Sequence, residues 1–297
     1  MFGLCRLCGE PRELQESHVI PSFVYKWLKE TSATGFLRFS DTPNRRVQDG
    51  YKEYWLCFDC EQRLNVWETQ FANKVFHPLN GDGGLRVRYE AWMIKFCVSI
   101  SWRTLMKVQE SGLEHLDLTQ QAAVKQTLDV WSKVLLDKLP HPARHEQHLL
   151  LFDAVTRDST HELPANINRY ILRTVGMDVI RSESTTFVFT KMSKFIVLGF
   201  IDVKHPRQWL GTKIHVREGM VGAGDYTVPT QLRDYIVEKA KRYASLVSSM
   251  SDTQRAKIAE AAWKDLDRVA LSGTFEAMQN DVELSGHAAF DIHKPKE

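Results

Sequence analysis

Two Cys-x-x-Cys pairs constrain this chain more than any other feature of its sequence. Cys5 and Cys8 form the first pair, and Cys57 and Cys60 form the second. This spacing lets both sulfurs of a pair reach one ion from a tight turn, and two pairs complete the tetrahedral sulfur shell that Zn²⁺ prefers. We therefore expect a structural Zn²⁺ site that brings the two pairs together in the fold.

The remaining cysteine usage favours zinc over a disulfide framework. The chain has five cysteines, and the fifth, Cys97, lies alone in an apolar segment. The alternatives are two unrelated reduced pairs or a thioredoxin-type redox motif, which needs a βαβ context that is missing here. An N-terminal module of about 80 residues would bury only a small core, whereas structural zinc contributes about 10 kcal/mol of folding free energy. We expect a reduced, cytoplasmic protein.

Composition excludes some classes of protein. With 297 residues and 43% hydrophobic residues, the chain is long enough for a substantial folded core. The longest apolar segment, 91–106, is interrupted by Lys95 and Arg103, so we expect neither a membrane span nor a secretory signal. The net charge of +2 gives no global basic field, so any contact with nucleic acid must be local. Nothing in the sequence indicates an oligomeric state.

Hydrophobic patterns divide the chain into two expected domains, 1–80 and 81–297. In the first, residues 21–30 predict a short helix, and residues 35–57 predict two extended pieces around a polar turn. From Glu61 onward an apolar stripe predicts a helix that is ended by His77-Pro78 and the NGDGG run at 80–84; the stripe consists of Leu64, Trp67, Phe71 and Val75. The second Cys pair lies directly before this helix.

The second expected domain mixes helices and strands. Residues 89–138 predict a helical region, 148–219 a β-rich region and 229–280 another helical region. Within the β-rich part, TTFVFT and KFIVLGFID read as a hairpin joined by a KMS link. We therefore predict an α+β protein, with a small zinc-bound module of the ββα-metal type followed by a larger mixed α+β domain.

His18 is the polar residue whose position most needs explaining. It stands in LQESHVIPSF, ten residues after the first Cys pair, at the edge of an apolar strand. A histidine there could be a packed side chain hydrogen-bonded to the backbone, a metal ligand or a general base.

The order of these features resembles the HNH endonucleases of the ββα-metal superfamily, over residues 1–80. The shared features are two zinc knuckles, a histidine before Ile-Pro on a strand between them, a second strand, and a helix at the last cysteine. In that family the histidine is the general base for phosphodiester hydrolysis, and His18 in SHVIP occupies its position. A divalent cation, Mg²⁺ or Mn²⁺, neutralises the developing charge there.

The resemblance places the catalytic cation on the helix that follows Cys60. Glu61 and Asn65, one turn apart, match the family's ligand positions, and Glu68 shares their face. A carboxylate is a suitable oxygen ligand for Mg²⁺. The alternative for Glu61 is an ordinary acidic residue in the first turn of a helix, favoured by the helix dipole.

Ser17 departs from the family pattern, which has an acidic residue before the histidine. Three explanations stay open: Glu61 replaces the lost charge, Glu16 or Glu13 reaches the cation, or the site has lost catalysis. Strand alternation turns Glu16 to the same face as His18, and Ser17 to the other face.

Four basic residues are candidates for phosphate contacts: Arg38, Arg45, Arg46 and Lys52. The resemblance makes DNA the expected partner, with RNA as the other nucleic acid. The expected function is a metal-dependent endonuclease, whose architecture would suit a defence effector. The alternative is a non-catalytic zinc module that binds nucleic acid or protein.

Overall fold

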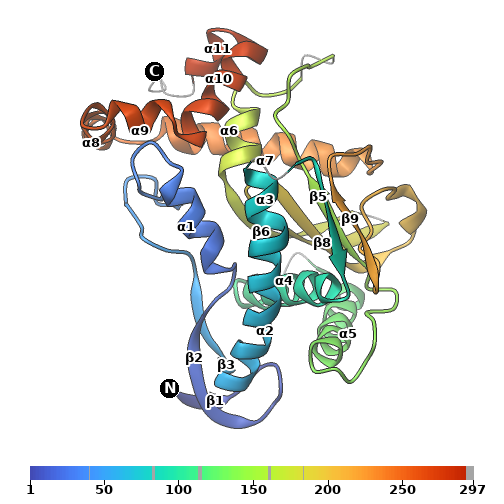
Figure 1. The fold of residues 1–297 in the computed structure, drawn as a ribbon. Helices are drawn as coiled ribbons and strands as arrows, with labels where there is room; N and C mark the ends of the chain where they lie inside the picture. Colours follow the sequence, from blue (N-terminus) through green and yellow to red (C-terminus); the bar gives the residue numbers. More distant parts are fainter. Residues whose placement is uncertain (40, 82–83, 113–115, 160–161, 183, 292–297) are drawn as a thin grey trace. The chain divides into compact units, whose positions relative to one another are not determined.

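The structure is a computed structural model that describes residues 1–291, apart from 40, 82–83, 113–115, 160–161 and 183. Helices and strands mix along the chain, and the strands form several separate sheets (Figure 1). The α+β class predicted from the sequence is therefore confirmed. Among the described residues, no helix is both long enough and apolar enough to cross a membrane.

The described residues pack into two compact units. The first comprises Met1–Pro21, Tyr51–Leu151 and Val175–Thr227, and the second comprises Ser22–Gly50, Phe152–Thr174 and Val228–Glu297. These ranges differ from the expected domains 1–80 and 81–297, because the chain enters the second unit after Pro21 and returns at Tyr51. Whether 1–80 and 81–297 fold as separate domains stays a prediction.

The first unit contains the strands. They form sheets in the orders β1-β2-β3, β4-β9 and β5-β8-β7-β6, and each neighbouring pair is antiparallel. Their bounds are β1 Phe2–Leu4, β2 Pro11–His18, β3 Lys52–Cys57, β4 Arg86–Glu90, β5 Gln147–Leu151, β6 Val175–Arg181, β7 Thr185–Met192, β8 Phe195–Val203 and β9 Glu218–Gly222. In Figure 1, β2 and β3 lie side by side in antiparallel directions, and β3 leads into the helix that follows it.

The β7–β8 hairpin is tighter than the sequence suggested. Lys191 and Met192 continue the ladder, opposite Ile196 and Phe195, instead of forming the expected KMS link. The turn consists of residues 193–194, and its first residue, Ser193, has φ 59°. Positive φ at this position matches the right-handed twist of a two-residue hairpin.

The helical elements of the first unit are α2 Phe58–Phe71, η1 Ala72–Phe76, α3 His77–Asn80, α4 Trp92–Glu110, α5 Leu118–Leu135 and η2 Pro206–Gln208. The segment from α2 to α3 is helical throughout, and its π-helical stretch lies at η1. Pro78 lies in the first turn of α3, where its missing N–H costs little, and the helical segment ends at Asn80, at the start of the 80–84 run that was expected to end it. The Asp117 capping box starts α5.

Buried side chains place α4 in the core of the first unit. It packs against α2, α5 and the β5-β8-β7-β6 sheet, and it buries Trp92, Cys97 and Trp102, as the apolar pattern predicted. The predicted stripe on the α2 segment also holds for Leu64 and Phe71, which are fully buried. These two helices therefore share one core.

The second unit is mainly helical. Its helices are α1 Ser22–Glu30, α6 Ile167–Arg173, α7 Thr230–Ser248, α8 Asp252–Trp263, α9 Leu266–Ala270, α10 Gly273–Ser285 and α11 Ala288–Asp291. The first extended piece expected within 35–57 is not a named strand, because its ladder is limited to an isolated bridge between Leu37 and Val47. The second piece is β3 of the first unit.

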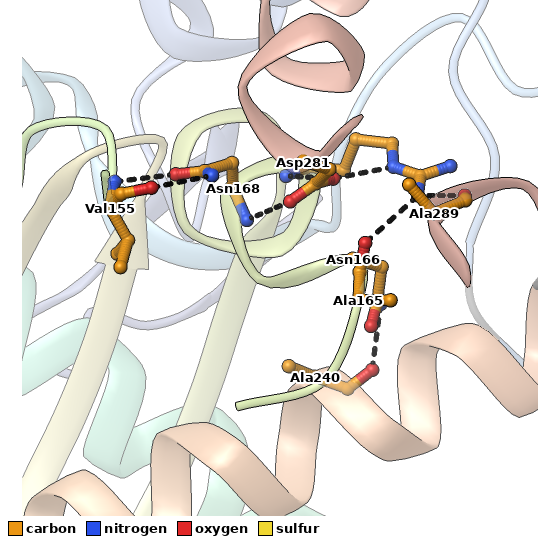
Figure 2. Close-up of polar contacts among 8 residues, drawn as sticks. Val155, Ala165, Asn166, Asn168, Ala240, Asp281 and Ala289 are labelled. Carbon is orange, nitrogen blue, oxygen red and sulfur yellow. Dashed lines mark hydrogen bonds and ion pairs between the residues drawn. The ribbon is translucent and has the colours of Figure 1, made fainter. Parts of the chain in front are cut away.

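A buried ion pair joins α6 to α10 inside the second unit (Figure 2). Asp281 is 0% exposed and accepts hydrogen bonds from the backbone N–H groups of Asn168 and Arg169, in the first turn of α6. Its carboxylate also pairs with the Arg169 guanidinium, with 2.7 Å between Nε and Oδ2. Asp281 therefore satisfies helix donors that would otherwise be orphaned.

Candidate metal centre

The four cysteines of the two pairs lie together in the first unit, as predicted. The sulfurs of Cys5, Cys8, Cys57 and Cys60 all lie within 4.8 Å of one another, and Cys8 Sγ is 4.0 Å from Cys57 Sγ. None of the four forms a disulfide. Tetrahedral zinc with Zn–S distances of about 2.3 Å places its sulfurs about 3.8 Å apart. The donor set therefore fits a structural metal ion such as Zn²⁺.

Local backbone structure brings the sulfurs together. The first pair lies in a turn in which Gly9 N–H donates to Cys5 O at 2.8 Å, and Gly9 takes φ 80°, a conformation that suits glycine. Cys57 ends β3 and caps α2, and its N–H donates to Cys5 Sγ at 3.3 Å. Cys60 lies in the first turn of α2, where the helix dipole favours a thiolate.

The sulfurs influence one another electrostatically. Burial opposes ionisation of Cys5, but hydrogen bonds from the backbone of Cys8, Cys57 and Leu7 lower its pKa to about 7. Burial, and then the negative charge of Cys5, raise the pKa of Cys60. Four thiolates cannot share this space without a cation, and a bound divalent metal would let them ionise together.

His18 is the last residue of β2 and is half-buried. Its register partner on β3 is Lys52. Its carbonyl oxygen accepts a hydrogen bond from Nη1 of Arg103, on α4, at 2.9 Å. The main chain that carries the imidazole is therefore held from a helix 85 residues further along the chain.

The acidic side chains of α2 differ in their surroundings. Oε2 of Glu61 is buried, and no protein donor in the described part of the chain hydrogen-bonds to it. Glu68 forms an ion pair with Arg103, with 2.5 Å between Oε1 and Nη2. Asn65 is exposed, so its role as a ligand stays a prediction. Oε2 of Glu61 is therefore a buried acceptor that could still bind a donor or a cation.

Glu68 connects these groups electrostatically. Burial has the largest effect and raises the pKa of Glu68. The positive charges of Arg103 and His18 lower this pKa, whereas the negative charge of Glu61 raises it. The net result is a pKa above the usual range. Glu61 and His18 therefore both lie close enough to influence one buried carboxyl. The expected base and the expected metal ligand therefore both act on Glu68.

Strand β2 is irregular just before His18. The pairing with β3 shifts register between Gln15 and Ser17, so simple alternation does not hold there. Ser17 is 3% exposed, and its hydroxyl has no hydrogen-bond partner among the described residues. Glu16 is exposed, with its carboxylate 3.5 Å from Nζ of Lys52. Glu16 therefore already has a cationic partner.

Arg103 is the residue at this centre that sequence reasoning missed. In the sequence it only interrupts an apolar run in a predicted helix. In the structure it is 1% exposed and contacts both His18 and Glu68. A charged residue on the buried face of an amphipathic helix is the one signal that pointed to it, because such a charge needs a partner.

The candidate phosphate-binding residues divide between the units. Lys52 lies in the first unit, at the start of β3, whereas Arg38, Arg45 and Arg46 lie in the second. Arg45 is exposed, and the Arg46 guanidinium lies 4.2 Å from the centre of the Phe36 ring. Burial, and then the charge of Arg46, lower the pKa of Arg38. Their contact with nucleic acid stays a prediction.

Comparison with family models, with curated proteins and with solved structures finds no match to this chain. The geometry of the first unit is therefore the basis for assigning a function to this chain.

Proposed function

We propose that this chain is a metal-dependent, zinc-bound endonuclease of the HNH type that hydrolyses phosphodiester bonds in DNA. Three features support the proposal: the four-cysteine cluster, the order β2, β3 and α2 around it, and His18 at the end of β2. This is the ββα arrangement that the sequence resemblance implies. The cysteine cluster would hold Zn²⁺ and tie the start of β2 to the start of α2.

The single observation that carries the proposal is the unpartnered oxygen of Glu61. A buried carboxylate oxygen without a hydrogen bond is costly, and a cation would remove that cost. Glu61 lies on the helix that the resemblance assigns to the catalytic cation. Its charge also acts on Glu68, the same carboxyl that is influenced by His18.

The residues of the site would divide the chemistry as follows. His18 takes the proton from the attacking water, and a positioned base of this kind contributes about 10² to 10⁴ in rate. Glu61, with Asn65 as the second candidate ligand, would hold Mg²⁺ or Mn²⁺. When bound, that cation supplies positive charge to the phosphate and the leaving oxygen. Glu61 would replace the charge that Ser17 does not provide.

DNA is the substrate that the resemblance favours, and RNA is the substrate to compare with it. Lys52, next to His18 across the β2–β3 ladder, is the basic residue nearest to the base in register. Arg38, Arg45 and Arg46 supply further candidate contacts to phosphates. A role as a defence effector would follow only if cleavage proves to be triggered by a signal.

A second candidate function is a non-catalytic zinc module that binds nucleic acid or protein. The observation in its favour is Ser17, a buried neutral residue at the position where the family has an acid. In that case His18 would be a structural histidine, and Glu61 would bind no cation.

Plasmid cleavage distinguishes the two functions. Zinc-loaded protein is incubated with supercoiled plasmid in Mg²⁺, in Mn²⁺ or in EDTA, and the rate of nicking is measured. We expect cleavage that requires the divalent ion, and a loss of about 10² to 10⁴ in rate for His18→Ala and Glu61→Gln.

Two control variants match these substitutions. His205 is an exposed histidine of the first unit, and Glu90 is an exposed acid on β4. His205→Ala and Glu90→Gln should cleave like the wild type. Cleavage by His18→Ala at the wild-type rate would refute the base, and absence of cleavage by the folded, zinc-loaded wild type would favour the binding module.

A further inference from the structure

The buried guanidinium of Arg103 contacts two residues of the candidate site, His18 and Glu68. Arg103 lies in the middle of α4, is 1% exposed and ranks among the largest fully buried side chains of the described residues. A buried charge is tolerated when it is paired and hydrogen-bonded. The partners of Arg103 therefore indicate why it is there.

Those partners lie on two different elements of the candidate site. Nη1 donates to the carbonyl oxygen of His18 at 2.9 Å, and Nη2 lies 2.5 Å from Oε1 of Glu68. Nε donates to the carbonyl oxygen of Ser99, within α4, at 3.4 Å. The two Nη atoms of arginine have fixed positions in one planar group, so one can donate to a carbonyl while the other pairs with a carboxylate, and a lysine does not reproduce this geometry.

The ion pair also decides which carboxylate remains for a cation. Glu61 and Glu68 lie on the same side of α2, and the charge of Glu61 raises the pKa of Glu68. Glu68 is occupied by Arg103, whereas Oε2 of Glu61 has no donor within the described residues. Without Arg103, Glu68 would become a second available oxygen ligand beside Glu61.

We propose that Arg103 is a positioning residue of this site: it fixes the main chain of His18 and keeps Glu68 away from the catalytic cation. The proposal rests on the proposed nuclease function and extends it beyond residues 1–80. Arg103 would not touch the substrate. It would act through the two groups that it contacts.

The test measures Mn²⁺ binding and plasmid nicking separately, on the zinc-loaded full chain. Binding of Mn²⁺ alone is followed by electron paramagnetic resonance, and nicking is measured at saturating Mn²⁺. Zinc content and thermal unfolding show whether each variant is folded.

Arg103→Met should separate the two measurements. Freed Glu68 adds a carboxylate, so Mn²⁺ should bind about tenfold more tightly. The His18 carbonyl loses its donor, so nicking should fall by about 100-fold. In Arg103→Met with Glu68→Gln, Mn²⁺ affinity should return to that of the wild type while nicking stays low.

Arg103→Lys covers the case in which the methionine variant does not fold. It keeps the positive charge beside Glu68 but loses the planar group, so Mn²⁺ affinity should stay unchanged while nicking falls. The matched control is Lys95→Met. Lys95 is a largely buried cation on the same helix, but its ion pair is with Asp137 and not with Glu68. Lys95→Met should match the wild type in both measurements.

The outcomes separate this proposal from the proposed function. Wild-type nicking and Mn²⁺ affinity in folded Arg103→Met or Arg103→Lys would overturn the positioning role alone. If the wild type binds Mn²⁺ but does not nick, the nuclease function fails. The assignment of Glu68 then depends on whether Arg103→Met still tightens Mn²⁺ binding.

Discussion

Two buried arginine–carboxylate pairs, one in each packing unit, differ in what surrounds them. Asp281 of the second unit accepts two backbone N–H groups in addition to Arg169 (Figure 2). Glu68 of the first unit pairs with Arg103 next to Glu61, whose buried oxygen lacks a protein donor in the described residues. The carboxylate oxygens of Asp281 hold helices α6 and α10 together. In the first unit, by contrast, one carboxylate oxygen of Glu61 is left without a protein donor among the described residues.

This difference distinguishes a charge cluster that stabilises the fold from one that can bind a cation. Burying an ion pair costs free energy in both units, so burial alone does not identify a site. A carboxylate saturated by backbone donors stabilises the fold. A carboxylate oxygen of Glu61 is left unsaturated in the unit that holds the four-cysteine cluster, and its capacity for a cation is the basis of the proposed function.

Loss of the metal ion from the four cysteines should have the largest effect on stability, and this effect should be confined to the first unit. A structural zinc site contributes about 10 kcal/mol, so Cys60→Ser should lose zinc and expose the backbone of β2, β3 and α2. Hydrogen exchange should increase there far more than in α6 and α10. The control is Cys97→Ala, a buried cysteine outside the cluster, which should keep its zinc.

Equal amounts of bound zinc and equal hydrogen exchange in Cys60→Ser and the wild type would show that the four cysteines do not hold a structural zinc ion. An increase of similar size in both packing units would show instead that the units do not differ in their dependence on zinc.

Removal of Asp281 should have the next largest effect. Asp281→Ala removes the carboxylate that pairs with the Arg169 guanidinium and with two helix N–H groups, so the free energy of unfolding should fall by about 3 to 5 kcal/mol. Urea denaturation measures this change. Glu283→Ala, an exposed acid on the same helix, should change it by about 0.5 kcal/mol or less. Equal effects of both substitutions would contradict the structural role of Asp281.

Removal of the Glu61 charge should have the smallest effect on stability. In zinc-loaded protein without Mg²⁺ or Mn²⁺, Glu61→Gln should leave the free energy of unfolding unchanged or raise it by about 1 kcal/mol, because an unpartnered buried charge is lost. Mn²⁺ should stabilise the wild type and not the variant. A loss as large as that of Asp281→Ala would show that Glu61 has a structural partner.

The parts of this centre that were predictable depend on short-range patterns. The Cys-x-x-Cys spacing specified the cluster, because each pair needs only one turn of chain. The position of Glu61 after Cys60 placed it in the first turns of a helix, and α2 does include it. The α+β class followed in the same way from periodicities of a few residues.

Long-range contacts account for what the sequence did not reveal. Arg103 reaches His18 across 85 positions, and no local pattern encodes that pairing. The irregular register near Ser17 depends on how β3 pairs with β2, which alternation within one strand cannot specify. The pairing of Asp281 with α6, 112 positions from Arg169, is of the same kind.

The central claim is that Glu61 holds a cation beside His18. Crystals of the zinc-loaded protein soaked in Mn²⁺, with diffraction measured at the manganese absorption edge, test it most directly. The account predicts an anomalous peak bonded to Oε2 of Glu61, with Glu68 still paired to Arg103. A structure in which Glu61 accepts a hydrogen bond from the protein, with no manganese bound to it, would contradict the account.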